Sequence, residues 1–172
     1  MTTKNEVIKE FVDNAIYRLD ESTRMIDIAF EKLKEEEVWM RPNKSSNSMG
    51  NLILHLCGNI RQYAISSLGE VEDTRVRDEE FNTTSRLPKK ELLDKLFNTV
   101  EMAKSTIKDT TDKQWLKKRD VQGFNFSGIG VVLHAVEHYS YHTGQIAFWV
   151  KQLKNNPLGF YDGMDLNELN GE

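Results

Sequence analysis

The chain has 172 residues, of which 38% are hydrophobic and 29% charged, and its formal net charge is −4. This length and composition predict one globular domain with a substantial hydrophobic core. The mild acidity argues against nucleic acids and anionic membrane surfaces as partners.

The single cysteine, Cys57, excludes an internal disulfide, and we expect its thiol to be a buried apolar group rather than a nucleophile. No apolar run is long enough to span a membrane, and the N-terminal residues do not resemble a signal peptide. The sequence therefore predicts a cytoplasmic protein.

Residues 4–33 carry the most regular pattern and are expected to form a helix. Small and apolar side chains recur at alternating spacings of four and three residues, which is typical of a helix packed in a bundle. These positions are Ile8, Val12, Ala15, Leu19, Ser22, Ile26, Ala29 and Leu33.

A loop over residues 34–48 is followed by a second predicted helix over residues 48–68, with Ser46 or Asn47 as its N-cap. Residues 69–87 are rich in charged side chains and form a connection that is long for a bundle. We expect either a crossover, with a short helical turn, or a segment that borders a site.

A third helix is predicted to begin near Pro88, with Ser85 as a candidate cap. Its buried stripe is expected to comprise Leu93, Leu96, Val100, Ala103 and Ile107. Residues 109–126 lack a clear pattern.

Ser127 is expected to cap a fourth helix that reaches residue 153. Four long amphipathic helices with almost no strand pattern predict an all-α four-helix bundle. The bundle would occupy residues 1–155 and leave a C-terminal tail, residues 156–172.

Three of the four histidines, His134, His138 and His142, lie on the fourth predicted helix at spacings of four residues. They span an arc of ~80° on one side of that helix. Two imidazoles one turn apart can bind one metal ion.

His55 lies on the second helix in a polar stripe with Asn51, Asn59 and Gln62. Such a stripe is either solvated or lines a cavity that faces the fourth helix. In the second case, two helices would bring three imidazoles to one ion.

Two segments carry a resemblance to a known family. One is Trp-Met-Arg-Pro at residues 39–42, followed by the segment 46–56; the other is residues 133–146, with the pattern H-x-x-x-H-x-G-Q-I. In this order and separation they resemble the DinB-like (DinB/YfiT-like) superfamily over roughly residues 5–155. Residues 73–81 are similar to a branch of that superfamily whose function is unknown.

The resemblance implies a four-helix bundle in which His55, His138 and His142 bind a divalent ion such as Ni²⁺ or Zn²⁺. It also implies a low-molecular-weight thiol such as bacillithiol, mycothiol or glutathione as a partner, and a homodimer. Thr143 stands where relatives often carry an arginine.

The role of His134 is open between a fourth ligand, a group that supports a ligand, and a pocket wall. We favour the last two, because three protein ligands leave a coordination position open to substrate. Further candidates for the pocket or for support of the ligands are polar side chains, for each of which packing, capping or solvent exposure is the ordinary alternative. They are Asn51, Asn59, Gln62, Glu137, Tyr141 and Gln145.

These features together predict a divalent-metal-dependent enzyme that transfers a thiol to an electrophilic small molecule, or a related hydrolase. The alternative is a non-catalytic bundle, small-molecule-binding or stress-related, with a structural or vacant metal site. No residue is assigned as catalytic.

Overall fold

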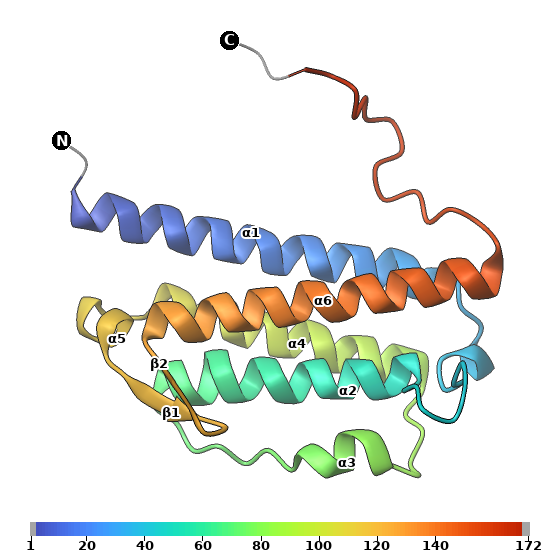
Figure 1. Cartoon of the computed structure of the whole chain (residues 1–172), viewed down its shortest axis with the longest axis horizontal. Helices are drawn as coiled ribbons and strands as arrows, with labels where there is room; N and C mark the ends of the chain where they lie inside the picture. Colours follow the sequence, from blue (N-terminus) through green and yellow to red (C-terminus); the bar gives the residue numbers. More distant parts are fainter. Residues whose placement is uncertain (1–2, 170–172) are drawn as a thin grey trace.

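The computed structural model describes residues 3–169, and four long helices form its main body (Figure 1). They are α1 (Lys4–Glu31), α2 (Met49–Ile60), α4 (Lys89–Lys108) and α6 (Gly128–Lys154). A π-helical turn, η2 (Arg61–Ser67), continues α2 without a break. The predicted all-α four-helix bundle is confirmed.

The helices are arranged in two parallel pairs. In Figure 1, α1 and α6 run in one direction, whereas α2 and α4 run in the opposite one. Helix α1 packs against α6 and α4, and α2 packs against the same two helices. Because α2 and α4 are parallel, the chain between them must travel back along the bundle. The charged segment 69–87 is therefore a crossover, and it contains the short helix α3 (Arg77–Asn82).

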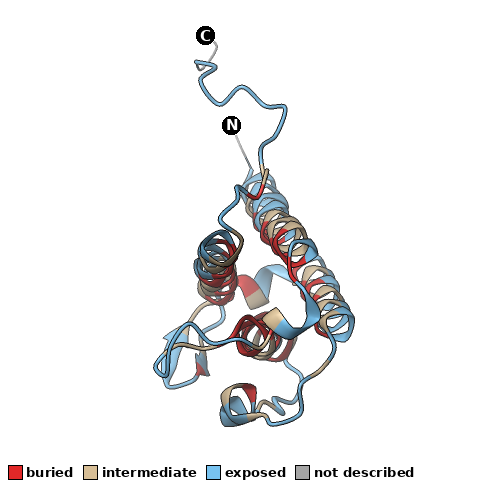
Figure 2. Cartoon of the chain, turned by 90° about the vertical axis from the view of Figure 1, so that its right-hand side faces the viewer, coloured by how far each residue is buried: buried red, intermediate tan, exposed pale blue. Residues whose placement is uncertain are grey.

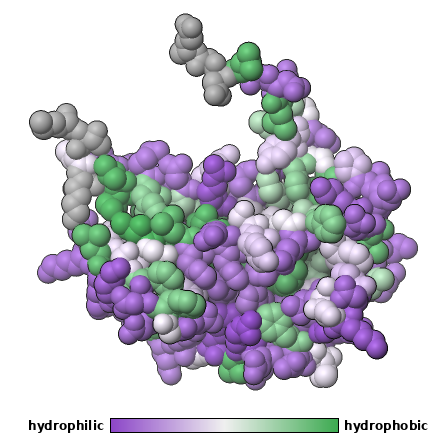
Figure 3. Space-filling model, in the orientation of Figure 1, coloured by the Kyte–Doolittle hydropathy of each residue, from purple (hydrophilic) through white to green (hydrophobic). Residues whose placement is uncertain are grey.

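The predicted stripes face the interior of the bundle (Figure 2), and hydrophilic side chains cover much of the face drawn in Figure 3. On α1, the seam is fully buried from Ala15 onward and partly buried at its first two positions. On α4, Leu92 is buried in place of the predicted Leu93, which is half-buried, and the other four positions are buried as predicted.

Two predicted helix caps are wrong. Ser48, rather than Ser46 or Asn47, caps α2, because its Oγ accepts a hydrogen bond from the backbone N–H of Asn51. Helix α4 has Pro88 rather than Ser85 at its N-cap position, without a side-chain hydrogen bond. The predicted cap of α6 is confirmed, since Ser127 Oγ accepts from the backbone N–H of Gly130.

The region 109–126 is more regular than its sequence predicts. It contains the short helix α5 (Asp112–Leu116) and an antiparallel hairpin of β1 (Arg119–Val121) and β2 (Phe124–Phe126). The hairpin turns at Gln122 and Gly123, which both have positive φ angles. A two-residue turn that ends in glycine is a recognised hairpin signal. Here the strands on either side have only three residues each, which is too short to show an alternating pattern.

A short 3₁₀ turn, η1 (Glu35–Glu37), lies in the loop that joins α1 to α2. After α6, the chain has no further helix or strand in the described residues. The beginning of this tail still packs on the bundle, because Leu158 is buried and the Phe160 carbonyl accepts a hydrogen bond from Arg24. Residues 1–2 and 170–172 of the predicted domain and tail lie outside the described residues.

Candidate metal centre

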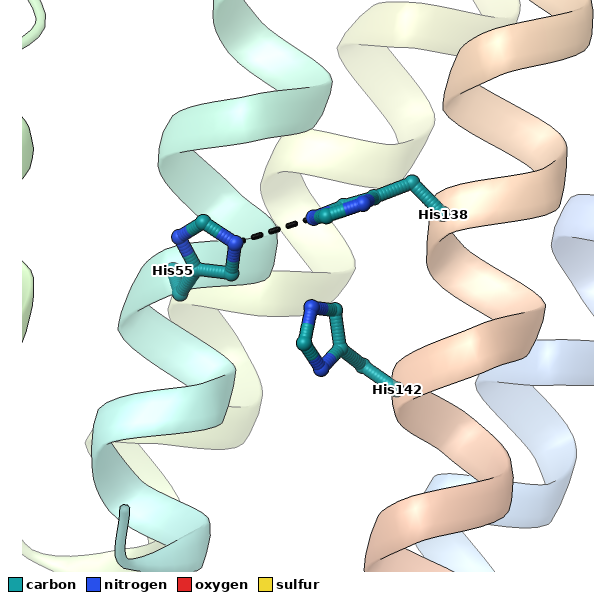
Figure 4. Close-up of side chains that lie close together, drawn as sticks. All are labelled: His55, His138 and His142. Carbon is teal, nitrogen blue, oxygen red and sulfur yellow. Dashed lines mark hydrogen bonds between the residues drawn. The ribbon is translucent and has the colours of Figure 1, made fainter. Parts of the chain in front are cut away.

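Three imidazoles from two neighbouring helices meet in the bundle (Figure 4). His55 on α2 faces His138 and His142 on α6, and one ring nitrogen from each lies within 4.8 Å of the other two. The Nε2 atoms of His55 and His138 are 2.9 Å apart. His55 and His142 are buried, and His138 is half-buried.

The orientation of His55 is set by Glu80 on α3. Glu80 Oε2 lies 2.8 Å from His55 Nδ1, so the carboxylate accepts the Nδ1–H and leaves the Nε2 lone pair facing the other two imidazoles. A carboxylate behind a histidine fixes the tautomer and makes the ring a better ligand.

Glu80 is held in turn by Arg75, whose Nε and Nη2 donate to the carboxylate at 2.7 and 2.9 Å. Burial opposes ionisation of Glu80, but the hydrogen bonds from Arg75 and His55 outweigh it and lower the pKa of the carboxyl. The pair therefore supplies a buried, ionised acceptor for His55.

Gly58 makes room for this pair. It lies on α2 close to one turn after His55, and a Cβ added there would meet Glu80 Oε1 at 1.9 Å and Arg75 Nε at 2.9 Å. Any larger residue would displace the carboxylate from its position beside His55.

His142 is oriented by the predicted residue Gln145. His142 Nδ1 donates to Gln145 Oε1 at 2.8 Å, which leaves the Nε2 lone pair of this ring free as well.

The remaining ring, His138, is neutral at physiological pH. Burial, followed by the nearby His142 and His55, lowers the pKa of His138 to about 3. Burial also lowers the pKa of His142, against the opposing effect of the Gln145 hydrogen bond. Neutral imidazole is the form that binds metals, so the donor set fits a divalent ion.

His134 lies outside this cluster. Its ring stacks on Tyr63, with centroids 3.9 Å apart, and its Nε2 is 3.3 Å from Asn59 Nδ2. It also stacks on His138, with centroids 5.4 Å apart. This placement agrees with a wall or supporting position rather than with a fourth ligand.

Three residues of the polar stripe, Asn51, His55 and Asn59 on α2, are buried, and Gln62 on η2 is half-buried, so the solvated interpretation of the stripe is wrong. Helix α3 and the crossover cover this face, and two of the predicted amides bind that segment. Asn51 Nδ2 donates to the backbone carbonyl of Glu80, and Gln62 Oε1 accepts from Arg75 Nη1.

Two further candidates lie on the exposed side of α6. The ring of Tyr141 is 62% exposed and contacts His142 edge-on, with centroids 5.0 Å apart. Glu137 is exposed, and no described residue forms a hydrogen bond with it. Glu137 raises the pKa of His134 through its charge, but burial lowers that pKa more strongly.

Sequence reasoning allowed that the charged segment 69–87 borders a site, but it missed Glu80 and Arg75 as the residues that contact His55. A buried histidine requires a hydrogen-bond partner, and that requirement was the available signal. The charged crossover follows the helix that carries His55, but the sequence of the crossover does not identify which of its carboxylates is buried.

Cys57 is buried, as predicted. Burial raises the pKa of its thiol to about 12, so the reactive thiolate is scarce at neutral pH. This agrees with a packing role.

A sequence model described as "Protein of unknown function (DUF1572)" matches residues 6–160. The chain belongs to the DUF1572 family. A search of curated proteins found no match to this DUF1572 chain.

Solved structures share the fold of this DUF1572 protein. YfiT from Bacillus subtilis, described as a probable metal-dependent hydrolase with an unusual four-helix bundle topology, is 14% identical with a TM-score of 0.67; the match covers 90% of this chain and 91% of YfiT. A DinB-like protein from Bacillus cereus is 16% identical with a TM-score of 0.66, over 86% of this chain and 92% of that one. A variant of the mycothiol-dependent maleylpyruvate isomerase is 17% identical with a TM-score of 0.65, over 85% of this chain and 63% of the isomerase.

The predicted resemblance is confirmed: the family match supplies the branch of unknown function, and these structures supply the DinB-like fold. Within residues 3–169, no helix is both long and apolar enough to cross a membrane.

Proposed function

We propose that this protein is a divalent-metal-dependent enzyme that joins a low-molecular-weight thiol to an electrophilic small molecule. The observation that carries the proposal is a group of three mutually facing imidazoles from two helices. Among residues 3–169, no fourth His, Cys, Asp or Glu joins that group. Catalytic metal sites keep such an open position, whereas structural zinc sites close it with a fourth protein ligand.

His55, His138 and His142 would hold the ion, which we propose to be Zn²⁺ or Ni²⁺. When bound, such an ion supplies Lewis acidity, which lowers the pKa of a coordinating thiol or water and provides a nucleophile at neutral pH. Glu80 and Gln145 keep the Nδ1 proton on two of the rings, so that the Nε2 atom of each ring would be available to hold the ion. His134 and Asn59 form a wall beside His138.

The similar structures support the proposal through their own descriptions, one as a metal-dependent hydrolase and one as a mycothiol-dependent isomerase. Their identities are too low to transfer either reaction, so thiol transfer rests on the open metal site. The homodimer and the cytoplasmic location stay predictions.

Metal content tests the proposal. The untagged protein and its His138→Ala variant should be analysed for bound metal, with His134→Ala as the matched control from the same helix. We expect stoichiometric Zn or Ni in the wild type and in His134→Ala, and loss of the metal in His138→Ala.

Absence of metal from the wild type after reconstitution would overturn the enzyme proposal. Loss of the metal in both variants would instead indicate that His134 is a fourth ligand, so that no coordination position is left open. For the loaded protein, consumption of a thiol such as glutathione should depend on an added electrophile and on His138; metal binding without turnover of any thiol would favour the non-catalytic alternative.

A further inference from the structure

A cavity of about 730 Å³ adjoins the three-histidine cluster at His142. The loop that precedes α2 forms one wall, and the C-terminal half of α6 forms the other. This volume suits a small molecule. We call it the His142 cavity.

The wall of the His142 cavity contains no Asp, Glu, Lys or Arg. Apart from His142 and the rings of Tyr141 and Trp149, its polar side chains are amides and hydroxyls, contributed by Asn43, Ser45, Ser46, Asn47, Gln145 and Gln152. A second cavity of about 520 Å³, between α2, α4 and the crossover, is lined by charged side chains that include Arg61, Glu79 and Lys95. The absence of charged side chains from its wall therefore distinguishes the His142 cavity from this second cavity.

Three aromatic side chains of α6 line the same cavity. Tyr141 and Phe148 are 62% and 61% exposed, and Trp149 is half-buried. Large exposed rings on a cavity wall offer flat apolar surface on which another ring can stack. The contact between Tyr141 and His142 places this surface beside the proposed metal ligand.

We propose that the His142 cavity binds the electrophilic substrate, and that the substrate is an uncharged molecule with an aromatic ring. An ionic group held against these walls, away from the proposed ion, would lose hydration without gaining a countercharge, whereas amides and hydroxyls can satisfy neutral polar groups. The inference rests on the proposed function, because it assigns the electrophile to this side of the same site. The ionised ends of a thiol partner then lie outside this cavity.

Two probes that share a ring and differ in charge test the inference. Neutral 4-nitrobenzyl alcohol and anionic 4-nitrobenzoate should be titrated into the full chain while tryptophan fluorescence is followed, because nitroaromatic rings quench a nearby indole. The two are compared in the metal-free protein, where the carboxylate has no ion to bind, and the alcohol is repeated with the zinc-loaded protein. We expect saturable quenching by the alcohol in both forms and about tenfold weaker binding of the benzoate. The Trp149→Phe variant should lose most of the quenching.

Matched variants locate the binding site. Phe148 and Phe124 are similarly exposed, but Phe124 lies on the hairpin away from the cavity. Phe148→Ala should weaken binding of the alcohol about tenfold, and Phe124→Ala should leave it unchanged. Gln152→Lys, which adds a positive charge to the wall, should strengthen binding of the benzoate.

Equal or tighter binding of the benzoate by the wild type would overturn the uncharged class. If neither probe reaches saturation, or if the two phenylalanine variants weaken binding equally, the cavity is not the binding site. Metal analysis of the same samples separates the two proposals. Probe binding without any metal uptake would contradict the proposed function alone, and metal uptake without probe binding would contradict this inference alone.

Discussion

The proton of His55 is held on Nδ1 by a carboxylate that comes from a different part of the chain. Glu80 accepts that proton, Arg75 neutralises the carboxylate, and Gly58 leaves the space that both require. At the residue scale, the proposed metal site therefore depends on side chains that would not touch the ion.

Glu80→Gln should weaken zinc binding about 10- to 100-fold, because the amide no longer supplies an ionised acceptor for His55. A competition titration with a chromophoric chelator measures the change. Glu79→Gln is the matched control, since Glu79 is an exposed neighbour of the same type. Equal zinc affinity in the Glu80→Gln variant and the wild type would rule out this positioning role.

Gly58→Ala, like Glu80→Gln, should lower zinc affinity, because the new methyl group displaces Glu80. For the same reason it should lower the free energy of unfolding by about 1–3 kcal/mol. Gly144→Ala is the matched helical control. A Cβ at Gly144 meets nothing within 4 Å, so this change should raise stability by about 0.5–1 kcal/mol. Urea unfolding of the metal-free proteins measures both. A Gly58→Ala variant as stable and as metal-competent as the wild type would contradict the packing described for Glu80.

The stability of the metal-free protein should fall as the pH drops below about 6.5. Burial lowers the pKa of His134, His138 and His142 in the folded state, so the unfolded chain binds more protons in this range. For His138 the loss continues to about pH 3. Unfolding free energies of the wild type and of His138→Gln should be compared between pH 7 and 4, since carboxylates titrate in both proteins. We expect a shallower dependence in the variant; identical slopes would mean that His138 is not buried as a neutral ring.

At the element scale, each long helix can be predicted from its own sequence, whereas the structure of the segments between the helices cannot. The four-and-three spacing of α1 and the three histidines of α6 predict both the helices and the faces that they bury. The hairpin and α3 are too short for periodicity to identify. The position of α3 depends on contacts with α2, such as the hydrogen bond between Asn51 and the Glu80 backbone. The position of the hairpin depends on contacts with η2, such as the hydrogen bond from Arg119 to the Ser67 carbonyl.

The N-terminal cap of α2 offers a test at this scale. Ser48→Ala should lower the free energy of unfolding by about 1 kcal/mol, because Ser48 Oγ accepts the Asn51 N–H and donates to Asn51 Oδ1. Ser46→Ala, a change of the same size two residues earlier, should have little effect. A larger loss of stability for Ser46→Ala than for Ser48→Ala would contradict the cap.

For the whole molecule, the parallel arrangement of α2 and α4 determines where the crossover runs. The crossover returns along the outer face of α2 and brings Glu80 to the back of His55, while α6 supplies the other two imidazoles from inside the bundle. The sequence, with its family resemblance, predicted which three histidines meet. It could not predict the buried carboxylate behind His55, because that contact joins segments whose approach is set by the path of the crossover.

The central claim is that His55, His138 and His142 bind one ion and leave a coordination position open. Anomalous diffraction at the zinc edge, from a crystal of the zinc-loaded protein, tests it most directly. We predict a single peak about 2.1 Å from the Nε2 atoms of these three residues, with no fourth protein ligand. A peak at another position, or a shell closed by His134 or any other side chain, would contradict the claim.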